Sequence, residues 1–355
     1  MVRVLIVDDS AFMRRLLTDL LAASGQLEVV GTARNGEDAV QKNQRLRPDV
    51  ITLDVEMPVM DGLAALDQIL STRPVPVVMF SSLTQAGAKT TLEALSKGAV
   101  DFLGKPESPK QLHDPLLRAM VVEKILSASA VDLSKLIPSP AMQLQPQPVP
   151  IVSRLRTPQI GAPTLVGIGT STGGPRALQQ VIPGLPADGG TAYLVVQHMP
   201  PGFTRSLAER LNGMSELTVL EAEDGALVEA NHAYIAPGGQ HLTVAQSGGR
   251  LSLQLQRTAA VNGHRPSVDV LFSSLAELPT YCGAAALLTG MGTDGAQGLY
   301  QLRQAGVYTI AEDSSTAVIY GMPRAAVALG AAIKVAPLPE VSSAILYGLA
   351  VGKER

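Results

Sequence analysis

Residues 165–174, Leu-Val-Gly-Ile-Gly-Thr-Ser-Thr-Gly-Gly, decide the fold of the C-terminal half of this chain. The first four residues form a run typical of a buried strand, and the last six form a glycine-rich turn that contains Ser171. A helical pattern from Pro175 to Val181 follows directly. A strand, a tight turn and a helix in this order indicate an α/β fold, in which such a turn lies at the carboxyl edge of a parallel sheet.

The glycine-rich turn fits two kinds of site. It matches the pattern G-x-S-x-G, which holds a serine hydroxyl on a tight turn for nucleophilic attack. Its glycines and the N–H groups at the start of the helix also suit a turn that binds phosphate. The turn alone does not distinguish the two sites.

Two further strand ends carry the residues that a serine nucleophile needs. Tyr193–Gln197 predicts a strand that ends just before His198, and Ala284–Leu288 predicts one that precedes Asp294 in a glycine-rich loop. A histidine can take the proton of the Ser171 hydroxyl, and an aspartate can orient the imidazole and stabilise its charged form. A lone histidine is usually structural and an aspartate between glycines often only forms a turn. Their joint placement at one sheet edge favours a Ser-His-Asp site.

The chain order and the backbone of these loops refine the hypothesis. The order is Ser, His, Asp, whereas α/β-hydrolases have Ser, acid, His, so the chain is not an ordinary α/β-hydrolase. Attack on an ester creates an oxyanion that backbone N–H groups must stabilise. The loops around Met291 and His198 are the candidate donors.

Polar residues also collect at strand ends near the N-terminus. Asp8 and Asp9 end the first predicted strand, Asp54 ends the third, and Ser81 and Lys105 follow the fourth and fifth. Because these ends meet at one edge of a parallel sheet, the carboxylates would repel one another unless a cation intervened. Mg²⁺ is the natural occupant, and Lys105 supplies a second positive charge. Such a pocket suits phosphoryl transfer.

The composition bounds the class of protein. The 355 residues are 46% hydrophobic and 17% charged, which fits two folded domains and excludes a disordered chain. A net charge of −3 gives no reason to expect nucleic-acid or membrane-surface binding. Cys282 is the single cysteine, and its place at the start of a strand predicts a buried thiol. Without an apolar run of ~18 residues or a signal peptide, we expect a cytoplasmic protein with no direct membrane insertion.

The patterns divide the chain into three parts. Residues 1–126 alternate strand and helix patterns in five βα units, which predicts a five-stranded parallel, flavodoxin-like sheet. Asp61-Gly62 and Ser108-Pro109 are predicted helix starts. Residues 127–161 include a stretch rich in proline and glutamine and are predicted to be a linker. Residues 162–350 return to a doubly wound, Rossmann-like α/β pattern, with a hairpin expected at 241–255.

The N-terminal residues resemble the receiver domain of response regulators. The stretch at 53–62, Leu-Asp-Val-Glu-Met-Pro-Val-Met-Asp-Gly, is similar to that family's phosphorylation loop, and the resemblance covers about the first 126 residues. It implies that Asp54 accepts a phosphoryl group from a histidine kinase. It also implies that Mg²⁺ is held by Asp9, Asp54 and the backbone of Glu56, with Asp8 acting indirectly.

The same resemblance assigns roles to three residues at the far end of the pocket. Ser81 and Lys105 would sense the bound phosphoryl group. Phe102 stands where the receiver family keeps an aromatic switch residue. The resemblance therefore implies that the C-terminal domain is controlled by phosphorylation.

The C-terminal stretches resemble the catalytic domain of the chemotaxis protein-glutamate methylesterases. Thr170 stands where that family commonly has alanine, and the serine is retained. The resemblance implies hydrolysis of glutamate methyl esters on chemoreceptors to glutamate and methanol, and deamidation of receptor glutamines, with no cofactor for the esterase reaction. The similar stretches are Gly169–Gly174, Gln197–Pro200, His264–Asp269, Gly290–Gly295 and Tyr320–Pro323.

His264 and Arg265 keep two interpretations. The methylation helices of chemoreceptors are acidic in this family, so the two residues could form a basic lip that attracts the substrate. Alternatively, Pro266 stiffens this loop and Ser267 caps the helix that follows. The sequence does not choose between these interpretations.

Three other functions remain as alternatives. A response regulator that acts only by binding would need a degenerate catalytic site, but its residues are all present. A DNA-binding regulator would need a basic helical module, which residues 162–350 do not provide. A serine hydrolase or amidase acting on small esters would share the same site and differ only in substrate.

Overall fold

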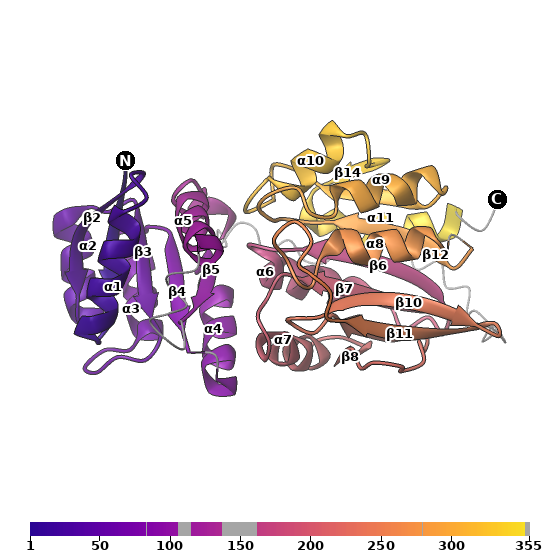
Figure 1. Ribbon diagram of the computed structural model, residues 1–355, viewed down its shortest axis with the longest axis horizontal. Helices are drawn as coiled ribbons and strands as arrows, with labels where there is room; N and C mark the ends of the chain where they lie inside the picture. Colours follow the sequence, from indigo (N-terminus) through magenta and orange to yellow (C-terminus); the bar gives the residue numbers. More distant parts are fainter. Residues whose placement is uncertain (83, 106–114, 137–161, 279, 352–355) are drawn as a thin grey trace. The chain divides into compact units, whose positions relative to one another are not determined.

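The computed structural model describes residues 1–82, 84–105, 115–136, 162–278 and 280–351. The chain forms two compact units, Met1–Gln143 and Leu144–Arg355 (Figure 1). Each unit has its own sheet and its own buried apolar core.

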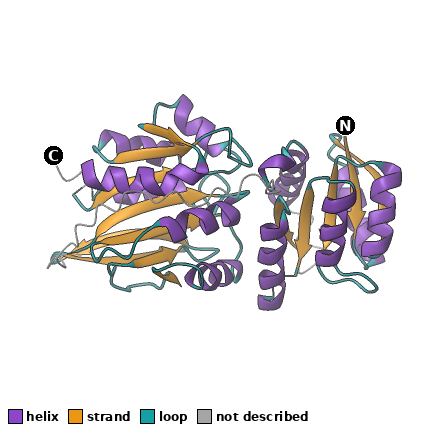
Figure 2. Ribbon diagram, turned by 180° about the vertical axis from the view of Figure 1, so that it is seen from behind, coloured by secondary structure: helices purple, strands orange, loops and turns teal. Residues whose placement is uncertain are grey.

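The N-terminal unit has a five-stranded parallel sheet in the order β2-β1-β3-β4-β5, with helices on both faces (Figure 2). This confirms the predicted flavodoxin-like arrangement. The strands are β1 (Val2–Val7), β2 (Leu27–Ala33), β3 (Val50–Asp54), β4 (Val77–Ser81) and β5 (Asp101–Gly104). The helices are α1 (Ala11–Ala22), α2 (Gly36–Leu46), α3 (Gly62–Thr72), α4 (Gln85–Lys97) and α5 (Pro115–Ser129).

Polar side chains fix where three of these helices begin. Ser10, Asn35 and Asp61 precede α1, α2 and α3, and each accepts a hydrogen bond from the backbone N–H three residues later. Such a cap satisfies an N–H group that the helix itself leaves unpaired. The predicted start at Asp61-Gly62 is confirmed, and the one predicted at Ser108-Pro109 lies outside the described residues.

The described end of the N-terminal unit is partly helical. Helix α5 continues to Ser129, past the predicted domain end at residue 126. A short 3-10 helix, η2 (Leu133–Lys135), follows, and Leu136 is buried. The first residues of the predicted linker thus have regular structure, and residues 137–161 lie outside the described residues.

The C-terminal unit has a seven-stranded parallel sheet in the order β14-β13-β12-β6-β7-β9-β8, confirming the predicted doubly wound α/β fold. The hairpin of β10 and β11 is also confirmed. The strands are β6 (Thr164–Thr170), β7 (Thr191–Gln197), β8 (Thr218–Glu221), β9 (His232–Ile235), β10 (His241–Ser247), β11 (Arg250–Gln256), β12 (Cys282–Leu287), β13 (Tyr308–Glu312) and β14 (Lys334–Ala336). The helices are α6 (Gly174–Val181), η4 (Ile182–Gly184), α7 (Phe203–Asn212), α8 (Val268–Ala276), α9 (Ala296–Gln304), α10 (Met322–Ala328) and α11 (Leu338–Val351).

The strand order reverses at β6. From β6 the chain continues to β7, goes on to the edge strand β8 and comes back to β9 between them. It then crosses to the other side of β6 for β12, β13 and β14. Such a reversal leaves a crevice at the carboxyl ends of the central strands, and ligands of open α/β sheets bind there. The loops that follow β6, β7 and β12 therefore lie at this crevice.

Glycine and small residues let helices lie close to this sheet. A Cβ atom at Gly169 of β6 would lie 2.2 Å from Cγ1 of Val268, so α8 packs directly on the strand.

Cys282, the first residue of β12, is only 6% exposed, which confirms the predicted buried thiol. Burial raises the pKa of this thiol to about 12. Its role is therefore packing.

Candidate functional site

Ser171 and His198 are neighbours at the carboxyl edge of the sheet. They directly follow β6 and β7, two strands whose last residues, Thr170 and Gln197, are paired in register. The N–H of His198 donates to the carbonyl of Thr170 (3.2 Å). The Gln197 side-chain amide donates to the carbonyls of Ser171 (2.9 Å) and His198 (3.2 Å). One buried amide thus joins the serine turn to the histidine loop.

The serine turn depends on two glycines. Gly173 has φ of 79°, a left-handed conformation that glycine adopts without strain, and it begins α6. A Cβ atom at Gly174 would lie 2.0 Å from Oε1 of Gln197. A side chain at Gly174 would therefore displace the amide that holds Ser171 and His198 together. Ser171 itself is only 7% exposed.

Asp294 is buried and accepts several hydrogen bonds. Its Oδ2 accepts from the N–H of Val268 (2.6 Å), and its Oδ1 accepts from Ser267 Oγ (2.7 Å) and Asn262 Nδ2 (3.0 Å). Burial alone would raise the pKa of Asp294, but hydrogen bonds from His198, Asn262 and Ser267 outweigh burial and hold it below the usual range. The carboxylate is therefore ionised at neutral pH.

His198 is hydrogen-bonded to this carboxylate. Its Nε2 lies 2.8 Å from Oδ2 of Asp294. Because an ionised carboxylate only accepts hydrogen bonds, Nε2 carries a proton, and Nδ1 is the ring nitrogen that can act as the base. That Nδ1 is buried and has no hydrogen-bond partner within the described residues. The arrangement leaves a free base at Nδ1.

His264 and Arg265 lie in different surroundings. The His264 ring stacks on His198, with centroids 3.7 Å apart and planes 9° from parallel. Arg265 points to backbone carbonyls and donates to that of Thr258 (2.7 Å). Ser267 caps α8 by accepting from the N–H of Val270, as the second interpretation predicted. The role of His264 and Arg265 as a substrate lip stays a prediction.

Met291 lies in the loop between β12 and α9. A Cβ atom at Gly321 would lie 3.2 Å from Cα of Met291, so this loop is closely packed against the start of α10. A Cβ atom at Gly290 would lie 2.8 Å from Cβ of Ser171, so the loop also borders the nucleophile. The assignment of the N–H groups of Met291 and His198 to an oxyanion hole stays a prediction.

Sequence reasoning missed a buried pair that supports the serine turn. Thr289 accepts from the N–H of Ser171 through its carbonyl (3.0 Å), and its hydroxyl donates to the carbonyl of Thr172 (2.9 Å). The N–H of Thr289 donates to Glu312, a fully buried carboxylate at the end of β13 (2.7 Å). Its place at a carboxyl strand end was the signal that could have identified Glu312.

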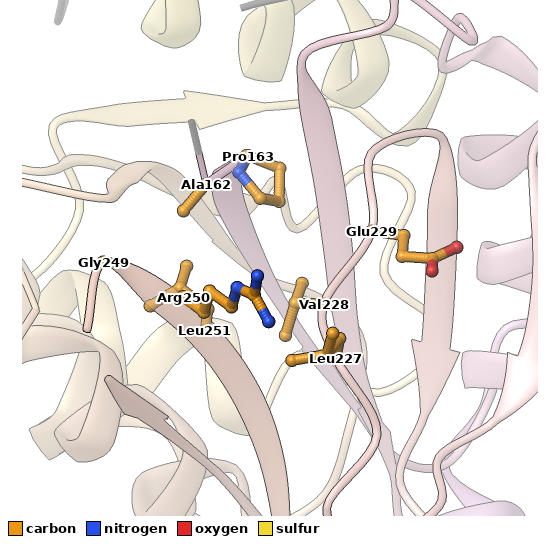
Figure 3. A pocket seen from close by; sticks show the side chains of 8 residues that line it. All are labelled: Ala162, Pro163, Leu227, Val228, Glu229, Gly249, Arg250 and Leu251. Atoms are coloured by element: carbon orange, nitrogen blue, oxygen red, sulfur yellow. The ribbon is translucent and has the colours of Figure 1, made fainter. Parts of the chain in front are cut away.

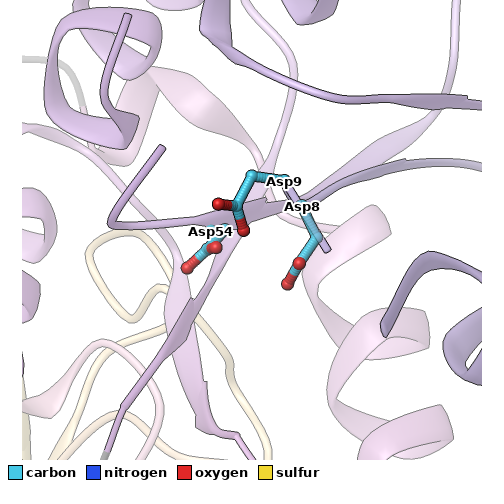
Figure 4. Close-up of side chains that lie close together, drawn as sticks. All are labelled: Asp8, Asp9 and Asp54. Atoms are coloured by element: carbon cyan, nitrogen blue, oxygen red, sulfur yellow. The ribbon is translucent and has the colours of Figure 1, made fainter. Parts of the chain in front are cut away.

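The N-terminal pocket brings the predicted acidic residues together. Oxygen atoms of Asp8, Asp9 and Asp54 lie within 4.8 Å of one another (Figure 4). Nζ of Lys105 lies 3.0 Å from Asp8 and 2.6 Å from Asp54. Burial raises the pKa of Asp54 to about 6, although Lys105 acts in the opposite direction. Three carboxylates at this spacing fit a hard cation that prefers oxygen ligands.

The other predicted receiver residues have these surroundings. The N–H of Glu56 donates to Oδ1 of Asp54 (3.4 Å). Ser81 is fully buried, and its hydroxyl donates to the carbonyls of Ser82 and Gly87 (both 3.2 Å). Phe102 is buried on β5. The roles of Glu56, Ser81 and Phe102 stay predictions.

A surface hollow elsewhere in the C-terminal unit contains none of the predicted site residues. It has a volume of about 320 Å³ (Figure 3). Its lining combines apolar residues with one basic and one acidic side chain: Ala162, Pro163, Leu227, Val228, Glu229, Gly249, Arg250 and Leu251. It is separate from the Ser171 loop.

None of the helices in the described ranges is both long and apolar enough to cross a membrane.

The fold and the two sites define a class of protein in which an acidic pocket suited to phosphoryl transfer and a Ser-His-Asp constellation belong to one α/β chain.

Comparison with known proteins identifies the family within this class. The family model described as CheB methylesterase matches residues 166–345, and the response regulator receiver domain model matches residues 4–117. The chain therefore belongs to the CheB methylesterase family and carries a receiver domain at its N-terminal end.

Relatives match along the whole chain. The Bacillus subtilis protein-glutamate methylesterase/protein-glutamine glutaminase is 44% identical and is covered completely, as is this chain. The Geobacillus kaustophilus protein of the same name is 47% identical over 97% of this chain and 98% of its own. The crystal structure of the Thermotoga maritima CheB methylesterase catalytic domain is 42% identical, with a TM-score of 0.51, over 52% of this chain and 98% of that one.

Proposed function

We propose that this protein hydrolyses glutamate methyl esters on chemoreceptors and deamidates receptor glutamines, as a phosphorylation-activated enzyme of sensory adaptation. The names of its full-length relatives and its receiver domain support this activity. The observation that carries the assignment of the site is the His198–Asp294 pair, which commits Nε2 to the carboxylate and leaves Nδ1 as the ring nitrogen available for catalysis.

Ser171, His198 and Asp294 divide the chemistry between them. Ser171 Oγ attacks the ester carbonyl carbon while Nδ1 of His198 accepts the hydroxyl proton. The imidazolium then donates from Nε2 to Asp294, which stabilises its charge. His198 returns the proton to the departing methoxy oxygen, so methanol leaves and an acyl-enzyme remains. Water activated by His198 hydrolyses that ester, releasing glutamate and restoring Ser171.

The two ring nitrogens have the opposite roles to those in chymotrypsin-type triads, where the aspartate binds Nδ1. Here Asp294, in the loop after β12, binds Nε2 of His198, which follows β7 on the other side of β6. The oxyanion would be stabilised by backbone N–H groups of Met291 and His198, whose loops border Ser171. A glutamine amide would follow the same steps and release ammonia.

The receiver pocket supplies the control. Asp54 is the proposed phosphoryl acceptor, because it is buried beside Lys105 at the edge of the sheet. Asp9, Asp54 and the carbonyl of Glu56 would hold Mg²⁺, with Asp8 assisting. Mg²⁺ bound there supplies charge neutralisation for the phosphoryl oxygens. Ser81, Lys105 and Phe102 would respond to the new phosphoryl group.

The partners follow from this chemistry. Methylated chemoreceptors are the proposed substrate, and a histidine kinase is the proposed phosphodonor. The proposed location is the cytoplasm, and no nucleic acid is involved. The esterase reaction uses no cofactor, because Ser171, His198 and Asp294 supply nucleophile, base and counter-charge.

The deciding experiment is methanol release from methylated receptor membranes by the wild-type protein and Ser171→Ala. We expect release that a small-molecule phosphodonor stimulates and that Ser171→Ala abolishes. Release that survives Ser171→Ala would refute the nucleophile. Release from small free esters but from no receptor would indicate a different serine hydrolase.

A further inference from the structure

A four-residue turn brings two side chains against the His198–Asp294 pair. Val261 and His264 exchange two backbone hydrogen bonds, of 3.0 Å and 2.9 Å. Asn262 and Gly263 between them have φ of 53° and 80°. Two left-handed residues with the sequence Asn-Gly are the signature of a type I′ turn. The turn is therefore a rigid unit set by its own sequence.

This turn is anchored on both sides. After it, the N–H of Ser267 donates to Nδ1 of His241 (3.2 Å), and before it, Nε2 of His241 donates to the carbonyl of Ala259 (3.0 Å). His241 is fully buried on β10. One neutral imidazole thus ties both ends of the loop to the hairpin and fixes where the Val261–His264 turn lies.

The side-chain amide nitrogen of Asn262 donates hydrogen bonds to two carboxylates. Its Nδ2 donates to Oδ1 of Asp294 (3.0 Å) and to Oδ2 of Asp269 (2.8 Å). An amide nitrogen has two hydrogens, so both are used. Burial, and the nearby charge of Asp294, raise the pKa of Asp269. Asn262 therefore joins two carboxylates that would otherwise repel each other and holds Asp294 facing His198.

His264 limits the movement of the catalytic imidazole. Its ring lies flat on that of His198 at van der Waals distance. A ring covered on one face cannot tilt about its χ2 angle without breaking this contact. Such a tilt would move Nε2 away from Asp294.

We propose that Asn262 and His264 are positioning residues for the reaction, which the Val261–His264 turn holds against Asp294 and His198 respectively. This inference rests on the proposed function. It gives the turn a role beyond a substrate lip. A positioning role affects kcat, because loss of alignment slows the chemical step, whereas a lip affects KM, because it binds the substrate.

The experiment compares matched variants for kcat and KM in methanol release from methylated receptor membranes. We expect His264→Ala and His264→Leu to lower kcat by about 10- to 100-fold with KM within about twofold of wild type. His264→Phe keeps a flat ring at this position, and we expect it to retain kcat within about threefold. Rescue by phenylalanine but not by leucine is the result that packing alone does not give.

Asn262→Gly tests the other contact without straining the backbone, because glycine accepts the left-handed conformation. We expect kcat to fall by about tenfold. Asn231→Gly is the matched control, since Asn231 also has a positive φ of 65° and its side chain accepts from the N–H of Gly189. The proton on His198 Nε2, followed by NMR, should exchange with water faster in Asn262→Gly and His264→Ala than in the wild type.

The outcomes separate this inference from the proposed function. If Ser171→Ala abolishes release while Asn262→Gly and His264→Ala keep wild-type kcat and exchange, the positioning role is wrong and the function stands. A change confined to KM would instead support a role for His264 in a lip that binds the substrate. Release that survives Ser171→Ala would overturn both. If His264→Ala does not fold, the other two variants test the positioning role. A tenfold loss of kcat in Asn262→Gly with near wild-type kcat in His264→Phe supports it, and wild-type kcat in Asn262→Gly rejects it.

Discussion

At the scale of single residues, the charge of Asp294 is the feature most open to test. Asp294→Asn keeps the size of the side chain but removes the charge that fixes the proton on Nε2 of His198. We expect kcat for methanol release to fall by about a thousandfold or more. Asp224→Asn is the control, because Asp224 accepts from the N–H of Leu255 in the hairpin and should leave kcat unchanged. Equal losses in both variants would contradict the role of Asp294.

Cys282 gives a prediction about pH. Its pKa is about 12 in the folded protein, whereas an unfolded thiol has a pKa of about 8.5. Above pH ~8.5 the unfolded chain releases a proton that the folded protein keeps, so stability is lost as the pH rises toward 12. Relative to Cys282→Ala, the wild-type free energy of unfolding should fall by about 2 kcal/mol between about pH 7.5 and 10. Urea unfolding at each pH measures this free energy. A difference between the wild type and Cys282→Ala that stays constant with pH would show that the thiol ionises within the folded protein.

At the scale of elements, the β12–α9 loop and the serine turn are packed so closely that a methyl group should separate them. In Gly290→Ala, the new Cβ would lie 2.2 Å from Sδ of Met322 and 2.8 Å from Cβ of Ser171. We expect at least about a hundredfold loss of kcat, because the nucleophile must move. Gly213→Ala adds a methyl group 3.6 Å from the carbonyl oxygen of Arg210, at an ordinary φ of −70°, and should be neutral. Measurements of kcat and of thermal unfolding for both variants test this prediction.

The elements also show how far the sequence predicts the fold. The buried strands β6, β7 and β12 were predicted because parallel strands covered on both faces are continuous apolar runs. The edge strands β8 and β14 were missed. They are short and partly exposed, so their sequences lack both the apolar run and a regular alternation. Their pairing with β9 and β13 is a tertiary effect that no local pattern encodes.

The candidate site was predictable to the extent that it lies at strand ends. Ser171, His198 and Asp294 each follow a predicted strand, and the parallel sheet brings such ends together. The contact of His264 with His198 was not predictable, because it depends on a turn that the hairpin holds from outside the sheet. The support that Glu312 gives to Thr289 depends on the neighbouring order of β12 and β13.

At the scale of the whole molecule, two chemistries that share no residue lie on one chain. The N-terminal pocket is built from carboxylates and a lysine, and suits phosphoryl transfer. The proposed C-terminal site combines a hydroxyl, an imidazole and one buried carboxylate. Each unit has its own sheet and core, so a substitution in one site should leave the chemistry of the other intact.

This separation predicts the behaviour of Asp54→Asn. An amide cannot accept a phosphoryl group, so a small-molecule phosphodonor with Mg²⁺ should stimulate methanol release by the wild type and not by this variant, while basal release persists. Asp19→Asn is the control, because Asp19 is an exposed residue of α1 whose loss should change neither quantity. Conversely, Ser171→Ala should take up the phosphoryl group, measured by intact mass, and release no methanol. Stimulation that survives in Asp54→Asn would place the phosphoryl group on another residue, and loss of basal release would show that the two sites are not independent.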